Sequence, residues 1–529
     1  MRQKSGFWRA VPLILAALSL ARPSMFPTLS FGDQEFTPSD LAKRSAKAAG
    51  VLASIGIAEG DTFAVMLRNS PTLIEIMLAA RQIGAYLVSL NWHYKAQEAG
   101  YILRDSAAKA LVIHGDLLSQ IQAGIPDDMP LLEVEPDAAN LQQRQSTPSR
   151  TIDWYAHLAK TKPLTTTSDQ PRGMIAYTSG TTGQPKGVRR ILPRPEDRPA
   201  AAGRLACMYQ TGLGITPDGR CLISAPLYHS APTSYVMFAS QCGAWLRVEP
   251  RFDAETTLGA IERYKISRAY LVPTMLVRML RLPPEVRARY DLSSLQFVAV
   301  TGAPCAPNIK RATIDWLGDV IYEAYASSEL GYLTSISSKE ARVKPGSAGR
   351  PIEGVTIRIL DDQCRDVPVG TIGKIYARQT LALDFTYINR QQDRDAIEHE
   401  GFLTVGDIGY VDADGYLYVT DRRSDLVVSG GVNIYPAEIE AQLMAMTGVA
   451  DCAVFGIPNP EFGQSLVAVI QKSGNVTLTP DSVQAFLSKR LANFKIPDVI
   501  EFRDTLPREE TGKIFKRKLR DEYTADSNS

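Results

Sequence analysis

Three glycines, four hydroxyl side chains and one lysine occupy eight of the ten positions between Tyr177 and Val188. Glycine allows backbone N–H groups to approach an anion closely, and nearby hydroxyls add further donors. The lysine supplies a mobile positive charge. This composition predicts a loop that binds phosphate oxygens, formed by Thr178, Ser179, Gly180, Thr181, Thr182, Gly183 and Lys186.

The order of these residues differs from that of the P-loop in kinases and ATPases, which reads G-x-x-x-x-G-K-[ST]. Lys186 follows Pro185 and precedes Gly187, so the Mg²⁺-binding hydroxyl that comes after the lysine in a P-loop is missing. An ordinary P-loop enzyme is therefore disfavoured. The alternative to a phosphate site is a solvated turn between two strands.

A second candidate site, residues 323–329, reads Glu-Ala-Tyr-Ala-Ser-Ser-Glu and follows the apolar run at residues 320–322. Ligands bind beyond the carboxyl ends of strands in open α/β sheets. A carboxylate there can hold Mg²⁺ against phosphate oxygens, and an aromatic ring can stack on a base. The segment therefore predicts a nucleotide site, with a solvated strand end as the alternative.

Three later segments add groups that could serve such a site. A carboxylate at Asp407 can accept both hydroxyls of a ribose, and Arg422 can add a fixed fork of donors. Paired glycines after Ser429 allow close backbone approach, although they also suit a tight strand-to-helix turn. Lys513 ends a Gly-containing loop, which could bring its ammonium group to a site and remove it.

Taken in order, these motifs resemble the adenylate-forming (ANL) superfamily of acyl- and aryl-CoA synthetases, firefly-type luciferases and peptide-synthetase adenylation domains. The matches extend over residues 31–520. Residues 429–438 resemble the CoA-ligase branch, the acyl-CoA synthetases and AMP-dependent synthetases, and no carrier-domain serine motif follows them. The resemblance implies ATP, Mg²⁺ and CoA as cofactors or co-substrates, and a small carboxylic acid as the other partner.

The resemblance also assigns roles to single residues. On the nucleotide side, it places Glu329 on Mg²⁺, Tyr325 against adenine, Ser328 near the α-phosphate, and Asp407 with Arg422 on the ribose. On the acyl side, Gly302, Ala303 and Pro304 flank adenine and the acyl group, His229 lies between the acyl pocket and the reaction centre, Ser429, Gly430 and Gly431 line a CoA channel, and Lys513 is catalytic. A lone histidine is often structural, so both interpretations of His229 stay open.

Two positions depart from the family pattern. Ala326 replaces the glycine that usually follows the tyrosine, which narrows the acyl pocket. Ser424 stands at the hinge between the two domains, where Asp or Lys is usual. The pivot is retained, but a charge-dependent bias between two domain orientations is in doubt.

Elements that could position these residues are visible in the sequence. Helices are expected over residues 38–55 and 71–83, and apolar runs alternate with helix-length segments between residues 173 and 340, which predicts parallel α/β layers. Residues 346–419 suggest a small β barrel or meander. The expected fold class is α/β: a large N-terminal domain (1–421) of layered α/β lobes plus a small β barrel, and a small mobile α+β C-terminal domain (422–529).

Composition and charge exclude several classes of protein. The chain has 529 residues, of which 45% are hydrophobic and 22% charged, as in ordinary globular proteins. A formal net charge of +1 gives no reason to expect nucleic acid or an anionic membrane as a partner. The six cysteines are scattered without a C-x-x-C pair, which indicates reduced thiols of a cytosolic protein.

The N-terminus permits two interpretations. Arg2, Lys4 and Arg9 precede an apolar run at residues 11–20, an order also found in secretory signals. That run is too short for a bilayer, which takes about 20 apolar residues. Members of the resembled family generally open with a helix before a short strand pair. We therefore expect residues 1–22 to form a packed helix and the protein to be cytoplasmic.

The expected reaction is ligation of a carboxylic acid to CoA through an acyl-adenylate, with release of AMP and pyrophosphate. Small apolar residues at Ala231, Pro232 and Ala303 favour a bulky or long apolar acid, and the resemblance is to ligases of medium- or long-chain, alicyclic or aromatic acids. Three alternatives are an adenylate-forming ligase with a non-CoA acceptor, a membrane-associated acyl-CoA synthetase and a non-catalytic nucleotide-binding sensor. The retained Lys513, Glu329 and Asp407 argue against the sensor.

Overall fold

The computed structural model describes residues 26–135, 151–178, 184–422, 425–429, 432–459, 462–473, 476–508 and 514–526. Several predicted features lie outside these residues. They are the N-terminal helix, the phosphate-loop residues Ser179, Gly180, Thr181, Thr182 and Gly183, the hinge residue Ser424, the paired glycines Gly430 and Gly431, and Lys513.

The first large sheet has nine strands, and its central strands are parallel. Their side chains are buried on both faces, as the continuous apolar run of β13 predicts. Because β10, β12, β13 and β14 are parallel, their carboxyl ends lie at one edge of the sheet. The spatial order is β16 (Arg350–Pro351), β15 (Gly331–Ser337), β14 (Ile321–Ser327), β13 (Phe297–Val300), β12 (Arg268–Leu271), β10 (Arg220–Ile223), β11 (Trp245–Val248), β1 (Thr28–Phe31) and β2 (Gln34–Phe36).

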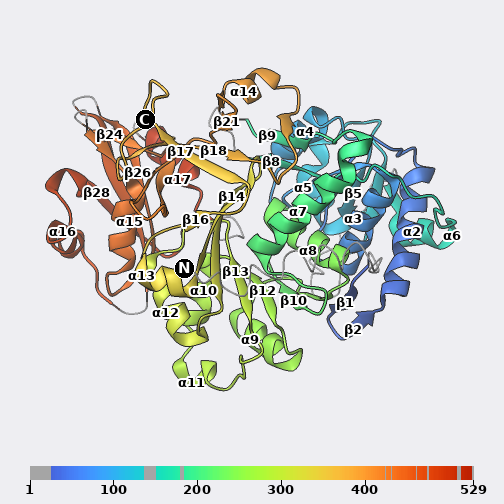
Figure 1. The fold of residues 1–529 in the computed structure, drawn as a ribbon, viewed down its shortest axis with the longest axis horizontal. Helices are drawn as coiled ribbons and strands as arrows, with labels where there is room; N and C mark the ends of the chain where they lie inside the picture. The colour runs from blue at the N-terminus through green and yellow to red at the C-terminus, as the bar shows by residue number, and fades with distance from the viewer. Residues whose placement is uncertain are drawn as a thin grey trace, which may run out of the picture.

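The second large sheet has eight strands and contains the predicted phosphate loop between β8 and β9. These two strands pair antiparallel, and Thr178 lies opposite Lys186 at the base of the loop. The spatial order is β19 (Phe385–Tyr387), β9 (Lys186–Arg190), β8 (Met174–Thr178), β4 (Tyr86–Ser89), β3 (Thr62–Met66), β5 (Leu111–His114), β6 (Leu131–Val134) and β7 (Thr151–Asp153). In Figure 1 this sheet lies on the right, and the first sheet passes through the centre.

The predicted helix boundaries are confirmed where capping residues marked them. Helix α2 (Pro38–Ser54) begins at a capping box formed by Thr37 and Asp40, and α3 (Pro71–Ile83) ends at Gly84 with φ of 77°. Apolar side chains of these helices join those of both large sheets in one core, which contains Phe63 and Leu222. The other helices are α4 (Ala96–Asp105), α5 (Gly115–Ile121), α6 (Trp154–Lys160), α7 (Arg198–Leu213), α8 (Ser230–Cys242), α9 (Ala254–Arg263), α10 (Pro273–Leu280), α11 (Pro284–Arg287), α12 (Pro307–Leu317), α13 (Ser338–Val343), α14 (Gln391–Asp395), α15 (Pro436–Met444), α16 (Pro480–Ser488) and α17 (Lys516–Asp526). Among the helices of the described ranges, none combines the length and the apolarity that a bilayer crossing requires.

The segment expected as a small barrel or meander forms a six-stranded antiparallel sheet. Its strands are β17 (Val355–Leu360), β18 (Gly373–Gln379), β20 (Glu398–His399), β21 (Phe402–Leu403), β22 (Asp407–Val411) and β23 (Leu417–Arg422). The α+β unit that follows has its own core, which includes Ile439, Val454 and Leu487. Its strands are β24 (Val427–Ser429), β25 (Val432–Ile434), β26 (Val449–Asn459), β27 (Gly463–Lys472) and β28 (Val499–Arg503), and they lie on the left in Figure 1.

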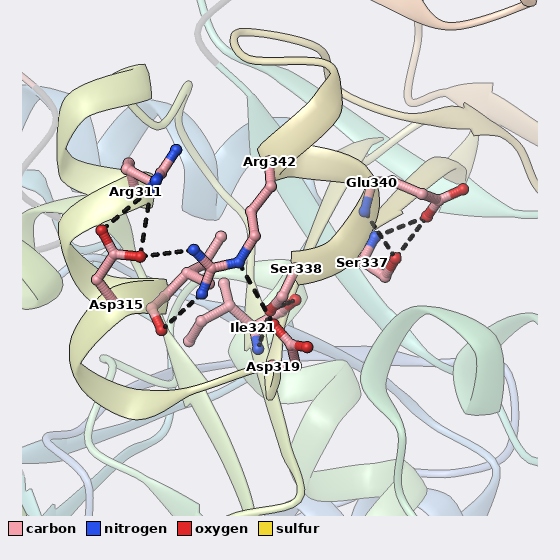
Figure 2. Close-up of polar contacts among 9 residues, drawn as sticks. Arg311, Asp315, Asp319, Ile321, Ser337, Ser338, Glu340 and Arg342 are labelled. Atoms are coloured by element: carbon pink, nitrogen blue, oxygen red, sulfur yellow. Dashed lines mark hydrogen bonds and ion pairs between the residues drawn. The ribbon is translucent and has the colours of Figure 1, made fainter.

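The amino end of β14 is fixed by polar contacts from α12 and α13 (Figure 2). The Ser338 hydroxyl accepts the Ile321 N–H and donates to the Ile321 carbonyl, both at 2.9 Å. Arg342 pairs with Asp315 at 2.6 Å and with Asp319 at 3.6 Å, which ties α13 to α12 and to the turn before the strand. These contacts hold the start of the strand that contains Tyr325.

A buried histidine makes the stability of the N-terminal region depend on pH. His114, at the end of β5, is 2% exposed, and its Nδ1 accepts the Arg68 backbone N–H at 3.2 Å. Burial, together with the nearby Arg68 guanidinium, lowers the pKa of His114 to about 4. The folded state therefore binds this proton less readily than the unfolded state. The contribution of His114 to the free energy of unfolding is therefore present above pH 6.5, and it is lost as the pH falls toward 4.

We expect the His114→Asn variant to lose less stability in acid than the wild type, because asparagine can accept the same N–H but does not titrate. From the pKa shift, the wild type should lose about 2 kcal/mol more than the variant between pH 7.5 and pH 5. Denaturant unfolding followed by tryptophan fluorescence at both pH values measures the difference. Equal losses in the two proteins would contradict the prediction.

Candidate functional site

Most of the predicted site residues in the described part of the chain gather at the carboxyl edge of the first sheet. His229 is the N-cap of α8 and comes shortly after β10. Gly302 follows β13 with φ of 93°, a left-handed conformation that favours glycine, and leads into Ala303 and Pro304. Ser328 and Glu329 follow β14. Parallel strands thus bring together segments that are far apart in the sequence.

One sequence-based expectation about this edge is wrong. The motif at residues 323–329 was expected to follow its strand, but β14 continues to Ser327 and therefore includes Glu323 and Tyr325. The strand is longer than its apolar run because β15 pairs with it antiparallel, with Tyr325 opposite Thr334 and Ala326 opposite Tyr332. A bulge lies between Tyr325 and Ala326, so the last residues of the strand depart from regular pairing.

The predicted adenine and ribose residues are in direct contact. The Tyr325 hydroxyl donates to Asp407 Oδ2 at 2.5 Å, although the two residues are 82 positions apart. Asp407 is 5% exposed and begins β22, and its backbone lies opposite Arg422 on β23. The structure therefore brings the three predicted nucleoside-binding positions together.

Glu329 is held beside the base of the predicted phosphate loop. Glu329 is only 8% exposed. Its Oε1 accepts from the Thr178 hydroxyl at 3.5 Å and from the Tyr387 hydroxyl at 3.1 Å. Burial and the Glu329 carboxylate raise the pKa of Tyr387, so the phenol stays protonated and remains a donor. Tyr387 was not predicted from the sequence.

Arg190 supports the backbone that presents Glu329. Its guanidinium donates to the carbonyls of Ser328 at 2.6 Å, Glu329 at 2.6 Å and Leu383 at 2.8 Å. Burial lowers the pKa of Arg190. Arg190 was not predicted from the sequence. The available signal was an arginine in a buried strand directly after the loop, since a buried charge needs several partners.

Lys186 is paired with an acidic residue that the sequence analysis also missed. Its Nζ lies 2.9 Å from Asp393 Oδ2 on α14 and 5.2 Å from the centre of the Tyr387 ring. The Lys186 side chain is 11% exposed and that of Asp393 36%. Lys186 lowers the pKa of the Asp393 carboxyl, which keeps it ionised. The lysine of the loop thus has a counter-ion within the protein.

The acyl side of the site is joined to the nucleotide side by a hydroxyl pair. Ser230, the first residue of α8, lies with its Oγ 2.9 Å from the Oγ of Ser328. The His229 ring packs against Tyr228 with centroids 4.3 Å apart, and Tyr228 meets Trp92 at 6.2 Å. His229 is therefore part of an aromatic cluster at the sheet edge, next to a residue that contacts the nucleotide motif.

Described residues frame the loop that contains Lys513. Arg508 and Ile514 form an isolated antiparallel bridge, and the Phe515 N–H donates to the Pro507 carbonyl at 2.9 Å. Arg508 is also paired with Asp451. Ser429, a predicted site residue that the structure describes, is half-buried at the end of β24.

The residues around Glu329 fit a magnesium ion. Mg²⁺ is usually bound by one or two carboxylates together with phosphate oxygens of the substrate. Glu329 is a buried carboxylate, and its Oε1 accepts from Thr178, at the base of the predicted phosphate loop, and from Tyr387. This donor set can hold the ion when nucleotide phosphates complete its coordination.

The chain belongs to the AMP-binding enzyme family, whose model matches residues 19–383, and the AMP-binding enzyme C-terminal domain matches residues 438–513. The family and its relatives make it an AMP-forming acyl-CoA synthetase, an acid–CoA ligase that uses ATP, CoA and a small-molecule acid.

Curated relatives cover nearly the whole chain. It is 32% identical to the 3-[(3aS,4S,7aS)-7a-methyl-1,5-dioxo-octahydro-1H-inden-4-yl]propanoyl:CoA ligase of Mycobacterium tuberculosis, over 97% of this chain and 99% of that protein. It is 30% identical to the indoleacetate–CoA ligase of Aromatoleum aromaticum, over 93% and 94%. The crystal structure of ATP-bound MatB from Rhodopseudomonas palustris matches with a TM-score of 0.82 and 25% identity, over 97% and 99%.

Proposed function

We propose that this ligase activates a bulky, largely apolar carboxylic acid as an acyl-adenylate and transfers the acyl group to CoA. The observation that supports the proposal best is the joint placement of Glu329 beside Thr178 and of Tyr325 on Asp407. These contacts support a metal-binding role for Glu329 and a nucleoside-binding role for Tyr325 and Asp407. An acid bound at the His229 side of the carboxyl edge of the first sheet would face the α-phosphate.

In the first step, the acid carboxylate attacks the α-phosphorus of ATP and pyrophosphate leaves. Negative charge grows on the phosphate oxygens, and groups already aimed at it lower the barrier. Lys186 and Lys513 supply positive charge, and the hydroxyls of the loop supply hydrogen-bond donors. Ser328 lies near the α-phosphate. Mg²⁺, when bound at Glu329, neutralises phosphate charge.

In the second step, the domain formed by residues 422–529 rotates about Ser424. Lys513 is withdrawn, and the face that contains Ser429, Gly430 and Gly431 lines a channel for CoA. The CoA thiol attacks the acyl carbon, and AMP leaves as the thioester forms. A single site thus serves two reactions by exchanging one of its walls.

Ring-bearing acids are the proposed substrates. Ala231 contributes a small side chain near His229, which leaves room for a bulky acyl group. Two of the relatives are named for indoleacetate and for an alicyclic propanoate, both of which contain rings. We therefore propose alicyclic and aromatic acids as substrates in preference to medium- and long-chain fatty acids.

Product analysis over an acid panel tests this function. Purified protein is incubated with ATP, Mg²⁺, CoA and fatty, aryl or alicyclic acids, and AMP, ADP, pyrophosphate and thioester are quantified. AMP and pyrophosphate should form in equal amounts, with thioester only when CoA is present. The Glu329→Gln variant should form little AMP. ADP as the product would overturn the proposal, and AMP release with another acceptor alone would favour a non-CoA ligase.

We expect Asp393→Asn to lower the KM for ATP by about 2- to 5-fold, the usual effect of a partly exposed ion pair. Lys186 must leave Asp393 to reach a phosphate, and asparagine removes the competing charge. Initial-rate measurements over an ATP series at two salt concentrations check this. The Asp395→Asn variant, on the same short helix, is the control, and an unchanged or raised KM in Asp393→Asn would refute the expectation.

A further inference from the structure

Three tyrosines from separate elements lie together behind the acyl side of the site. Tyr332 on β15 is directly opposite Ala326 on β14, so the two side chains are on the same face of the sheet. The Tyr332 ring meets Tyr209 on α7 edge to face, with centroids 6.3 Å apart. Tyr270 on β12 is the third member of this group, which we call the tyrosine cluster.

The ring of Tyr332 has a fixed position. It lies flat against Gly212 on α7, where a Cβ would be only 2.7 Å from the ring carbons. Tyr332 is 3% exposed, and its backbone carbonyl accepts from the Gln379 side chain at 2.6 Å. The phenol ring is therefore held rigidly, and the position of its hydroxyl is fixed.

Among the described residues, the buried Tyr332 hydroxyl has no hydrogen-bond partner. Buried hydroxyls are nearly always paired, so an unpaired one needs an explanation. Burial raises the pKa of this hydroxyl well above its ordinary value, and the neighbouring phenols of Tyr270 and Tyr209 raise it further. It is thus a neutral donor at any physiological pH, with other phenols close by.

Tyr270 connects the cluster to the predicted site. A Cβ on Gly302 would lie 3.8 Å from the Tyr270 hydroxyl and 3.6 Å from Val272. Gly302 belongs to the segment expected to flank the acyl group. The cluster is therefore adjacent to both Gly302 and Ala326, the two positions that border the acyl side.

Apolar side chains pack around the cluster, and one buried charge, the Arg190 guanidinium, acts on Tyr209. Tyr209 packs on Phe238 with centroids 5.5 Å apart, and Met208 is 1% exposed. Phe238 is on α8, the helix that begins after His229. Because that guanidinium already donates to three backbone carbonyls, a charged group would lose its hydration here for little return, whereas a neutral acceptor could take the hydrogen bond that Tyr332 lacks.

We propose that the tyrosine cluster selects acids whose apolar ring body has a neutral hydrogen-bond acceptor, such as a ketone, at the end distant from the carboxylate. Tyr332 donates to that acceptor, and Tyr270 and Tyr209 form the polar end of an otherwise apolar pocket. The inference rests on the proposed function, because it concerns the acid that the ligase activates. A site built to hydrogen-bond a substrate discriminates strongly against analogues that lack the group.

Paired acids that differ only in a ketone test the inference. The probes are 3-(4-oxocyclohexyl)propanoate and 3-cyclohexylpropanoate, with bicyclic pairs of the same kind and the general acid panel beside them. Pyrophosphate release gives kcat/KM for adenylation. The wild type should prefer each keto acid roughly 10-fold, the scale of one hydrogen bond. Tyr332→Phe should abolish the preference by losing activity on the keto acid alone.

Two controls separate specificity from folding. Tyr332→Phe removes an unpaired hydroxyl, so its melting temperature without ligand should equal or exceed that of the wild type. Tyr290→Phe, which removes a hydroxyl bonded to Glu255 on the outer surface, should keep the preference. Equal activity of the wild type on the two members of every pair, or a preference that survives in Tyr332→Phe, would overturn the inference and leave the proposed function intact. Failure to form AMP with any acid would overturn the proposed function, and the inference with it.

Discussion

Replacing Lys513 with alanine is expected to slow formation of the acyl-adenylate by about 10²–10³-fold, the usual effect of removing one group aimed at transition-state charge. Thioester formation from supplied acyl-adenylate should stay close to the wild-type rate. The two half-reactions respond differently because the proposal withdraws this lysine before the thiol attacks. Pyrophosphate release measures the first step, and rapid-quench thioester formation measures the second.

The described flanks of the loop favour this expectation. Arg508 and Ile514 pair at its base, and Arg508 is tied to Asp451 on β26. Leu506, Ile514 and Leu519 belong to a small apolar core of the C-terminal unit. Both described flanks are therefore anchored to that unit, and we expect a rotation of the unit to displace Lys513 with it.

A lysine elsewhere on the same unit provides the control for Lys513→Ala. Lys518 lies on α17, is exposed, and has the same charge. Lys518→Ala should leave the adenylation rate within about 2-fold, since isolated surface charges contribute little. If Lys513→Ala slowed both half-reactions equally, withdrawal of the lysine between the steps would be refuted.

The sequence predicted those parts of the fold that local signals define. Capping residues gave the bounds of α2 and α3, and continuous apolar runs gave the buried parallel strands β10, β12 and β13. The motif residues Thr178, Glu329, Tyr325 and Asp407 were identified because their types and order match a family. The structure then brought them together across two sheets and the barrel segment.

The residues that hold the motif in place could not be found in the same way. Arg190 contacts backbone carbonyls 138, 139 and 193 positions away, and Tyr387 reaches Glu329 across 58 positions. A backbone carbonyl has no side-chain signature, so no pattern around residue 328 indicates that it needs an arginine. The length of β14 was missed for a related reason, because its second half is defined by pairing with β15.

Arg190→Lys should reduce the rate of adenylation by about 10²-fold while the protein remains folded. Lysine retains the positive charge but lacks the planar fork that serves three carbonyls at once. The turn at Ser328 and Glu329 would then shift, and a displacement of about 1 Å at a reacting centre costs about this much. Pyrophosphate release gives the rate, and circular dichroism with thermal unfolding verifies the fold.

The neighbouring Arg189 provides a control. It separates loss of the carbonyl contacts of Arg190 from a general effect of charge or side-chain size. Arg189 is on the same strand but is exposed, with its guanidinium 5.8 Å from the Tyr86 ring. Arg189→Lys should therefore keep adenylation within about 2-fold of the wild type. In Arg190→Lys the loss should fall mainly on kcat, because the displaced carboxylate of Glu329 acts on charge that develops during the reaction. A normal kcat in a folded Arg190→Lys protein would show that the three carbonyl contacts do not position Glu329 for catalysis.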